Sequence, residues 1–277
     1  MATILDGKLL SKKIQEQLQE RISNMDTVPH LVIISIGDNA ASEVYIERKK
    51  QFGESVGVMV TVEQFPEDVS ENIILDIVNS YNTNQTVHGI IVQLPIPNHI
   101  NKEKIVNTIS PQKDVDGLTA RNMWRLMDNK EGIIPATARG IQLLLEEASI
   151  SLEGKHVVIV GDSFLVGKST AIHFLNLDAT VTVCHDKTKA LAKYTKLADV
   201  LVTAVGKEGI ITAEYVHENQ VVVDVGIIRN SAQYIVGDVA FNEVSEVVKA
   251  ITPVPGGVGP MTVACLFQNI ADLVEGE

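Results

Sequence analysis

Several polar residues have types and spacings that suit the binding of a small ligand. Tyr45 and Lys49 are four residues apart in the segment ASEVYIERKKQFGESVG, so a helix there would place both side chains on one face, within reach of a shared ligand. The charged neighbours Arg48 and Lys50 leave a second interpretation open, in which this face is simply solvated. Gln93 ends the apolar run HGIIVQLP, and the carboxyl ends of buried strands are where open α/β sheets bind ligands.

Two loops carry further candidates. Asp114 and Asp116 form the motif KDVDG, although Asp-x-Asp-Gly is also common turn chemistry. The segment ITPVPGGVGPMTVA (251–264) holds three prolines and three glycines just before the C-terminal helical stretch. Such a loop either presents bare backbone to a flat or bulky ligand or forms a rigid crossover.

The stretch VGDSFLVGKST (160–170) resembles two kinds of phosphate-binding loop. Its end is typical of a P-loop, but five residues separate Gly161 from Gly167 where the P-loop has four, so part of the backbone cradle would turn away from the anion. Because an apolar strand precedes the stretch and a helical pattern follows, it also reads as a loosened dinucleotide fingerprint, with Ser163 in place of the second glycine. Asp186, at the end of the next strand, is placed to hydrogen-bond an adenosine ribose. The dinucleotide interpretation is therefore favoured over the P-loop, and an ordinary strand-to-helix turn is the remaining alternative.

Composition narrows the class of protein. The chain has 277 residues, 45% of them hydrophobic and only 4% aromatic, a balance typical of buried parallel strands covered by helices. Its net charge of −12 argues against a nucleic-acid partner, although local fields still permit an anionic substrate. Cys184 and Cys265 are isolated in apolar surroundings, and the seven histidines form no metal-binding motif, so we expect two buried thiols and no metal. With no signal peptide and no long apolar run, we expect a soluble cytoplasmic protein without a membrane partner.

The elements that must position these residues alternate between strand and helix. This pattern predicts an α/β fold of two domains, built from right-handed βαβ units with parallel sheets. The border between the two halves is expected within 110–140. Predicted strands cover 30–37, 58–65, 88–95, 155–160, 179–185, 198–205 and 220–227, and predicted helices cover 41–57, 69–81 and 166–176.

Five motifs together resemble the bifunctional methylenetetrahydrofolate dehydrogenase/cyclohydrolase family, the FolD type. They are YIERK, GIIVQLPIP, KDVDGL, the loop around Ser163 and PVPGGVGPMTVA, and the resemblance runs from about residue 3 to 275. It implies oxidation of 5,10-methylenetetrahydrofolate to the 5,10-methenyl form by hydride transfer to a nicotinamide, followed by hydration to 10-formyltetrahydrofolate, in one-carbon metabolism. It also implies a catalytic, folate-binding domain (1–138, completed by the helix 256–277), a Rossmann-like NAD(P)-binding domain (139–255), a cleft separating them and a homodimer.

The resemblance assigns roles by matching position. Lys49 is implied to be the central catalytic group, Tyr45 to stack on or orient the folate, Gln93 to hydrogen-bond Lys49, and Asp116 to hold the amino edge of the pterin. The methenyl product is a cation, so we expect Lys49 to spend time neutral, with a pKa lowered by burial and by that positive charge. Further substrate-binding residues are expected at Pro255, Gly256 and Gly257, and cofactor-binding residues at Gly161, Asp162, Ser163, Gly167, Asp186, Gly206 and Ile227.

The chain departs from the family pattern at the cofactor site. Many members have Arg or Ser where this chain has Asp162 and Asp186, and two carboxylates there would repel the 2′-phosphate of NADP. Lys168, Lys187 or Lys189 could compensate. NADP, the family default, and NAD therefore both remain candidate cofactors. Another departure is the run PATARG (135–140), which lacks the second proline of the family's P-C-T-P and could loosen the loop between the domains.

Two functions of other classes stay open. A P-loop switch protein would bind a nucleoside triphosphate with Mg²⁺ through residues 161–170. A folate- or nucleotide-binding regulator of the same fold would have lost one or both activities.

Overall fold

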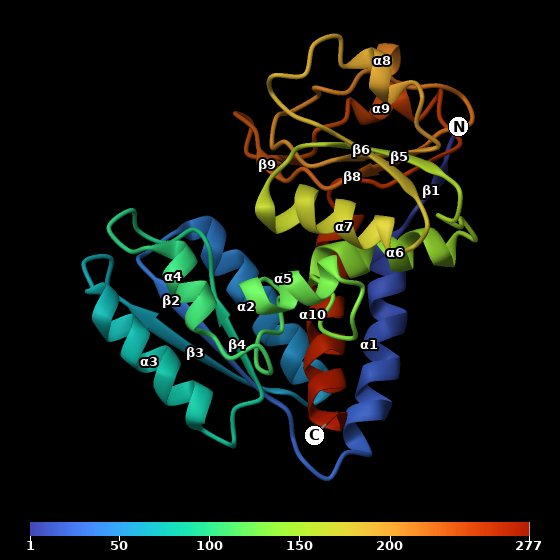
Figure 1. Ribbon diagram of the computed structural model, residues 1–277. Helices are drawn as coiled ribbons and strands as arrows, with labels where there is room; N and C mark the ends of the chain where they lie inside the picture. The colour runs from blue at the N-terminus through green and yellow to red at the C-terminus, as the bar shows by residue number, and fades with distance from the viewer. Residues whose placement is uncertain (277) are drawn as a thin grey trace. The chain divides into compact units, whose positions relative to one another are not determined.

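Two parallel sheets form the framework of the computed structural model, and each belongs to a separate unit of the chain (Figure 1). The structure describes residues 1–276, without the side chains of Ala40 and Ala41. One unit consists of Met1–Ser11 and Thr137–Thr262, and the other of Lys12–Ala136 and the residues from Val263 onward. The predicted α/β class with parallel sheets is confirmed.

The unit of Lys12–Ala136 is built on a three-stranded parallel sheet in the order β3-β2-β4. Its strands are β2 (His30–Ile36), β3 (Met59–Phe65) and β4 (Gly89–Val92). The central strand β2 is an apolar run that is buried along almost its whole length, as expected for a strand covered on both faces. Its pairing with both neighbours brings the carboxyl end of β4, and hence Gln93, to one edge of the sheet.

Helices cover both faces of this sheet. On one face, Ile74 and Val78 of α3 and Ile105 of α4 pack with Val32 and Ile90 in a buried apolar cluster. On the other face lie α2 and α10, joined by a stacked ring pair, Phe52 and Phe267, whose centroids are 5.3 Å apart. The helices are α1 (Gly7–Ser23), α2 (Ala40–Val56), α3 (Glu71–Thr83), α4 (Lys102–Thr108), α5 (Ala120–Met127) and α10 (Val258–Glu275), with α1 and α10 each contributing to both units.

The second sheet has six parallel strands in the order β1-β11-β8-β7-β5-β6. The strands are β1 (Thr3–Ile4), β5 (His156–Val160), β6 (Thr180–Cys184), β7 (Val200–Thr203), β8 (Val221–Asp224) and β11 (Ala250–Ile251). From β5 the chain adds β6 on one side of the sheet and then β7 and β8 on the other side. The strand β5 therefore marks the topological switch point of a Rossmann-like sheet. The loop that follows β5 therefore leaves the sheet where a dinucleotide is expected.

The six-stranded sheet is also covered on two faces. Figure 1 shows α6 and α7 on one face and the short helices α8 and α9 on the other. The remaining elements of this unit are α6 (Ala136–Glu147), a π-helical turn (Phe164–Lys168), α7 (Ser169–Leu175), α8 (Ala192–Thr195), a 3₁₀ turn (Ala213–Tyr215), the antiparallel pair β9 (Ile228–Arg229) and β10 (Ile235–Val236), and α9 (Phe241–Val244).

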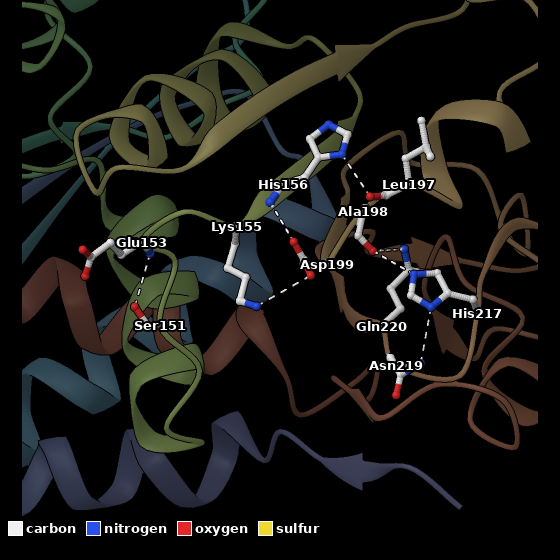
Figure 2. A network of polar contacts seen from close by, with 10 residues as sticks. All are labelled: Ser151, Glu153, Lys155, His156, Leu197, Ala198, Asp199, His217, Asn219 and Gln220. Atoms are coloured by element: carbon white, nitrogen blue, oxygen red, sulfur yellow. Dashed lines mark hydrogen bonds and ion pairs between the residues drawn. The ribbon is translucent and has the colours of Figure 1, made fainter.

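Polar side chains close the amino edge of this sheet (Figure 2). Asp199, just before β7, accepts a hydrogen bond from the backbone N–H of His156 at 2.9 Å and lies 3.7 Å from the ammonium of Lys155. The His156 ring donates to the carbonyl of Leu197, and the buried Gln220 amide donates to the carbonyl of Ala198. These contacts are structural hydrogen bonds at the amino edge, whereas ligands of open parallel sheets bind beyond the carboxyl ends of the strands.

The N-terminal segment differs from the domain division drawn from the sequence. Residues 1–138 were expected in one domain, whereas Met1–Ser11 belongs with Thr137–Thr262, because Thr3 and Ile4 pair with Ala250 and Ile251. The catalytic and cofactor-binding roles of the two segments stay predictions. Both cysteines are free and buried, as predicted. Within residues 1–276 there is no helix with the length and apolar character needed to cross a membrane, and no cluster of three metal-ligating side chains.

Candidate active site

Lys49 lies on the buried face of an amphipathic helix. The residues of α2 at positions 42, 46, 49, 53 and 56 are buried, which is helical spacing, and Lys49 is the one charged residue among these five. Its side chain is only 9% exposed, while Arg48 and Lys50 on either side are exposed. The solvated-face interpretation therefore does not hold for Lys49. A lysine in the buried stripe of a helix needs a polar partner, because an isolated ammonium is costly to bury.

Gln93 supplies that partner. Its backbone N–H continues the sheet by donating to the carbonyl of Ile34 at 2.8 Å, which fixes its position just beyond β4. The side-chain Nε2 donates to the carbonyl of Leu94 at 2.9 Å, so Oε1 is left to accept from Lys49 Nζ at 3.0 Å. Because an amide is neutral, this contact orients the amine without stabilising its positive charge as strongly as a carboxylate would.

The electrostatics of the site favour uncharged groups. Burial lowers the pKa of Lys49 below 10.5, and the negative charge of Asp116 opposes this shift. Burial raises the pKa of Asp116 above 3.8, opposed by Lys49 and assisted by the charge of Asp114. Lys49 and Asp116 thus interact electrostatically, and desolvation drives each of them toward its neutral form.

Asp116 stands on a loop that neighbouring side chains hold in place. The buried Asp114 carboxylate accepts hydrogen bonds from the Asn122 side chain at 2.9 Å and the Thr119 backbone N–H at 2.8 Å, so it closes the turn that contains Asp116. On the other side of the turn, Asn269 of α10 donates to the carbonyl of Val115 at 2.8 Å. The two aspartates of KDVDG therefore differ. Asp114 is hydrogen-bonded within the turn, whereas Asp116 is partly buried and interacts electrostatically with Lys49.

The positioning residues Asn122 and Asn269 were missed by the sequence interpretation. Both are fully buried amides. Asn269 follows Gln268 in an otherwise apolar helical stretch, and amides in such a stretch are the signal that could have identified it.

Tyr45 lies one turn before Lys49 on α2 and is half-buried. The Arg48 guanidinium carbon is 5.8 Å from the centroid of the Tyr45 ring, a cation–π arrangement. Burial raises the pKa of the Tyr45 hydroxyl, and Arg48 opposes that shift. Tyr45 is therefore a neutral phenol with one ring face near a cation, a group suited to packing against a flat ligand.

The loop after β5 shows why both of its glycines are needed. Gly161 has φ +116°, and a Cβ there would overlap the carbonyl of Ala204. A Cβ on Gly167 would overlap the carbonyl of Gly161, so the two ends of the loop are in direct backbone contact. Ser163 accepts a long hydrogen bond of 3.5 Å from the Gly167 N–H. The loop is thus a tight strand-to-helix turn of the kind that lets backbone approach a pyrophosphate.

The P-loop alternative is not supported by this geometry. In a P-loop, the hydroxyl that follows the lysine binds Mg²⁺. Here Ser169 is fully buried and its Oγ donates to the carbonyl of Leu165 at 2.9 Å, while Thr170 is also fully buried. Neither hydroxyl is available to a metal ion.

Two aspartates follow the neighbouring strands β5 and β6, where the adenosine ribose of the dinucleotide is predicted to bind. Val160 pairs with Cys184 across β5 and β6, so Asp162 and Asp186 each follow two residues after a paired position. Both are exposed, and the Asp186 carboxylate lies 2.8 Å from the ammonium of Lys187. This hydrogen bond to Lys187 lowers the pKa of Asp186, so the carboxylate is charged at neutral pH. These residues fit the ribose end of a nicotinamide dinucleotide.

The remaining predicted residues lie in the unit with the six-stranded sheet. Gly206 (φ +74°) and Ile227, which is 44% exposed, follow β7 and β8 at the carboxyl edge. Gly256 has φ +113°, and its carbonyl accepts from the N–H of Lys8 at 2.8 Å. Pro255, Gly256 and Gly257 thus belong to the same unit as the dinucleotide loop, whereas Tyr45, Lys49, Gln93 and Asp116 belong to the other.

Two features are typical of a dinucleotide-dependent enzyme. One is a Rossmann-like unit with a glycine-containing loop after its first central strand, and the other is an α/β unit with a buried amine that is hydrogen-bonded to an amide. Comparison with known families agrees and is more specific. Residues 5–116 match the tetrahydrofolate dehydrogenase/cyclohydrolase catalytic domain, and residues 135–277 match the NAD(P)-binding domain of the same family. The chain belongs to the tetrahydrofolate dehydrogenase/cyclohydrolase family.

Individual relatives cover the whole chain. The bifunctional protein FolD of Ligilactobacillus salivarius is 45% identical, over 99% of this chain and 98% of its own length. Among solved structures, the FolD enzyme of Campylobacter jejuni is 43% identical with a TM-score of 0.97, covering 100% of this chain and 99% of its own. The FolD of Trypanosoma brucei, solved with NADP and an inhibitor, is 31% identical with a TM-score of 0.94, covering 99% and 98%.

Proposed function

We propose that this protein oxidises 5,10-methylenetetrahydrofolate to 5,10-methenyltetrahydrofolate with a nicotinamide dinucleotide, and hydrolyses the product to 10-formyltetrahydrofolate. The observation that carries the proposal is the Lys49 amine, buried on α2 and held by Gln93 at 3.0 Å within the field of Asp116. The family membership of the whole chain supports it. The reaction belongs to one-carbon metabolism.

The first step needs a hydride acceptor and a rigidly held folate. The nicotinamide, when bound, accepts the hydride that leaves the methylene bridge. Asp116 offers acceptor oxygens to the paired N–H groups of a pterin, a charge-assisted contact that fixes the ring. Tyr45 packs against the folate, and Pro255, Gly256 and Gly257 are the proposed backbone contacts. The dinucleotide, either NADP or NAD, is proposed to bind to Gly161, Asp162, Ser163, Gly167, Asp186, Gly206 and Ile227.

The second step adds water to a cation. Methenyltetrahydrofolate is positively charged, and water attacks its bridging carbon with loss of a proton. The bond from that carbon to N5 then breaks, N5 takes up a proton as the new hydroxyl loses one, and the formyl group stays on N10. A neutral Lys49 amine can accept that proton, whereas an ammonium would repel the cation. The lowered pKa of Lys49 and its neutral amide partner both favour this role.

A two-part absorbance assay tests the proposal. Purified protein with methylenetetrahydrofolate and NAD or NADP should produce reduced nicotinamide, and methenyltetrahydrofolate added alone should disappear faster than in buffer. Calorimetric titration with each dinucleotide shows binding independently of turnover. If the protein binds a dinucleotide or folate but catalyses neither step, the regulator alternative replaces the enzyme. The homodimer, the cytoplasmic location and the absence of a metal cofactor stay predictions.

A further inference from the structure

Two carboxylates are buried at the carboxyl edge of the six-stranded sheet, apart from the candidate catalytic residues. Asp224 is the last residue of β8 and is 3% exposed, and Asp238 follows β10 and is fully buried. Burial raises the pKa of Asp224 to about 7, in opposition to its backbone N–H donors. Burying two neighbouring carboxylates costs stability unless both are well hydrogen-bonded, so their contacts show what they do.

Asp238 gathers the loop that leaves β7. Its Oδ2 accepts from the Thr203 hydroxyl at 2.9 Å and from the Val205 N–H at 2.6 Å, and its Oδ1 accepts from the Lys207 N–H at 2.8 Å. These donors are alternate residues of one short segment, and Gly206 lies inside it with φ +74°. One carboxylate therefore fixes the whole course of residues 203–207.

Asp224 holds Asp238 in turn. Its Oδ1 accepts from the N–H groups of Gly226 at 2.9 Å and Asp238 at 3.0 Å, and its Oδ2 accepts from the Val239 N–H at 2.9 Å. Gly226 packs directly on the Asp238 carboxylate, and Gly237 packs on that of Asp224, so a Cβ at either glycine would overlap a carboxylate. The two aspartates thus interlock the segment after β7 with the segment after β8.

We propose that Asp238, held by Asp224, is a positioning residue for the dinucleotide site. The proposal rests on the function proposed above, since the two interlocked segments carry Gly206 and Ile227, the exposed residues assigned to the cofactor. Ligands of parallel α/β sheets bind beyond the carboxyl ends of the strands, where loops need an internal support to keep a fixed shape. An aspartate suits this support because it only accepts hydrogen bonds, and all the polar partners above donate.

The decisive variant is Asp238→Asn. It keeps the shape of the side chain but places an amide N–H against a backbone or hydroxyl donor. We expect the dissociation constant for NAD or NADP, measured by titration calorimetry, to rise at least about tenfold. The KM for the dinucleotide should rise with it, more than kcat falls. Hydrolysis of methenyltetrahydrofolate, which consumes no dinucleotide, should stay within about twofold of the parent rate.

Asp199→Asn is the matched control. Asp199 also accepts a backbone N–H, but at the amino edge of the same sheet (Figure 2), so dinucleotide affinity should not change. If Asp238→Asn does not fold, Thr203→Val removes a single donor to Asp238 with little change of shape and should weaken dinucleotide binding to a smaller degree.

The outcomes separate the two proposals. A parent protein that binds no dinucleotide refutes the proposed function. Parent-like dinucleotide affinity in folded Asp238→Asn, or in Thr203→Val where the first variant is lost, overturns the positioning role alone. Equal losses of binding and of methenyltetrahydrofolate hydrolysis would also overturn it, because they indicate general destabilisation.

Discussion

Replacing Lys49 by Met should remove catalysis and increase stability at the same time. The Lys49 side chain is 9% exposed, and its amine contacts the neutral Gln93 amide at 3.0 Å. Methionine has a similar length and no charge, so it fills the same volume without a buried ammonium. A general base contributes about 10²- to 10⁴-fold, which corresponds to roughly 3 to 5 kcal/mol of transition-state stabilisation. We therefore expect methenyltetrahydrofolate hydrolysis to fall by at least about 100-fold.

The stability change follows from the direction of the pKa shift. Burial lowers the pKa of Lys49, so between that lowered value and 10.5 the unfolded chain binds more protons than the folded chain. The free energy of unfolding of the parent therefore rises with pH across this window, and it is reduced at lower pH, where the folded protein must carry a buried charge. Methionine needs neither a buried charge nor the loss of a proton that an uncharged Lys49 requires, so the Met variant should be more stable at neutral pH by about 1 to 2 kcal/mol.

Two measurements on the same samples test this reasoning. An absorbance assay follows hydrolysis, and scanning calorimetry follows unfolding, where about 1 kcal/mol corresponds to roughly 2 to 4 °C in Tm. Lys50→Met is the matched control, because Lys50 is exposed on the same helix and should change neither quantity appreciably. Parent-like hydrolysis in Lys49→Met would refute the catalytic assignment. Loss of activity together with loss of stability would show instead that Lys49 supports the fold.

Three further changes give smaller and separable effects. Gln93→Glu places a carboxylate beside Lys49 and should raise its pKa, so the pH at half-maximal hydrolysis moves up by about one unit or more; an unmoved pH profile would argue against a neutral amine as base. Asp186→Ser removes a negative charge at the predicted ribose site, and the ratio of the NADP to the NAD dissociation constants should fall about tenfold, measured by calorimetry. An unchanged ratio would place Asp186 outside the cofactor site. Arg21 binds Glu275 through two hydrogen bonds at 2.9 and 2.6 Å, and Arg21→Ala should cost about 1 kcal/mol in urea unfolding, less at high salt; a loss independent of salt would indicate packing instead of charge.

The sequence predicted the elements with strong local patterns. Apolar β-branched runs such as 156–160 and 221–224 became buried strands, because a parallel strand covered on both faces needs an uninterrupted apolar run. Gly161 and Gly167 lie in the predicted connection between a strand and a helix, and their backbone contact leaves no room for a side chain at either position. These features depend on residues close together in the chain.

Features that depend on distant residues could not be predicted. The strand Thr3–Ile4 is too short to show a pattern, and only its pairing with Ala250 and Ile251 makes it a strand. The interlock between Asp224 and Asp238 likewise joins two separate acidic residues, each of which looks like ordinary strand-end chemistry in the sequence. The burial of Lys49 also could not be predicted, because the spacing of Tyr45 and Lys49 fits either a solvated or a buried helix face. Which face of α2 is covered depends on how the helix packs on the sheet.

The contrast between the two buried acid sites indicates how the chain divides its tasks. The carboxylate oxygens of Asp224 and Asp238 accept hydrogen bonds from N–H and hydroxyl groups of the chain itself, and these bonds fix the loops. Asp116 instead interacts electrostatically with the Lys49 amine, and burial favours the neutral form of both groups. A Lys–Asp pair balanced in this way responds strongly to a new charge, and the substrate of the proposed second step brings a positive one. Binding of that cation should therefore favour a neutral Lys49 and a charged Asp116, which are the protonation states that the proposed hydrolysis requires.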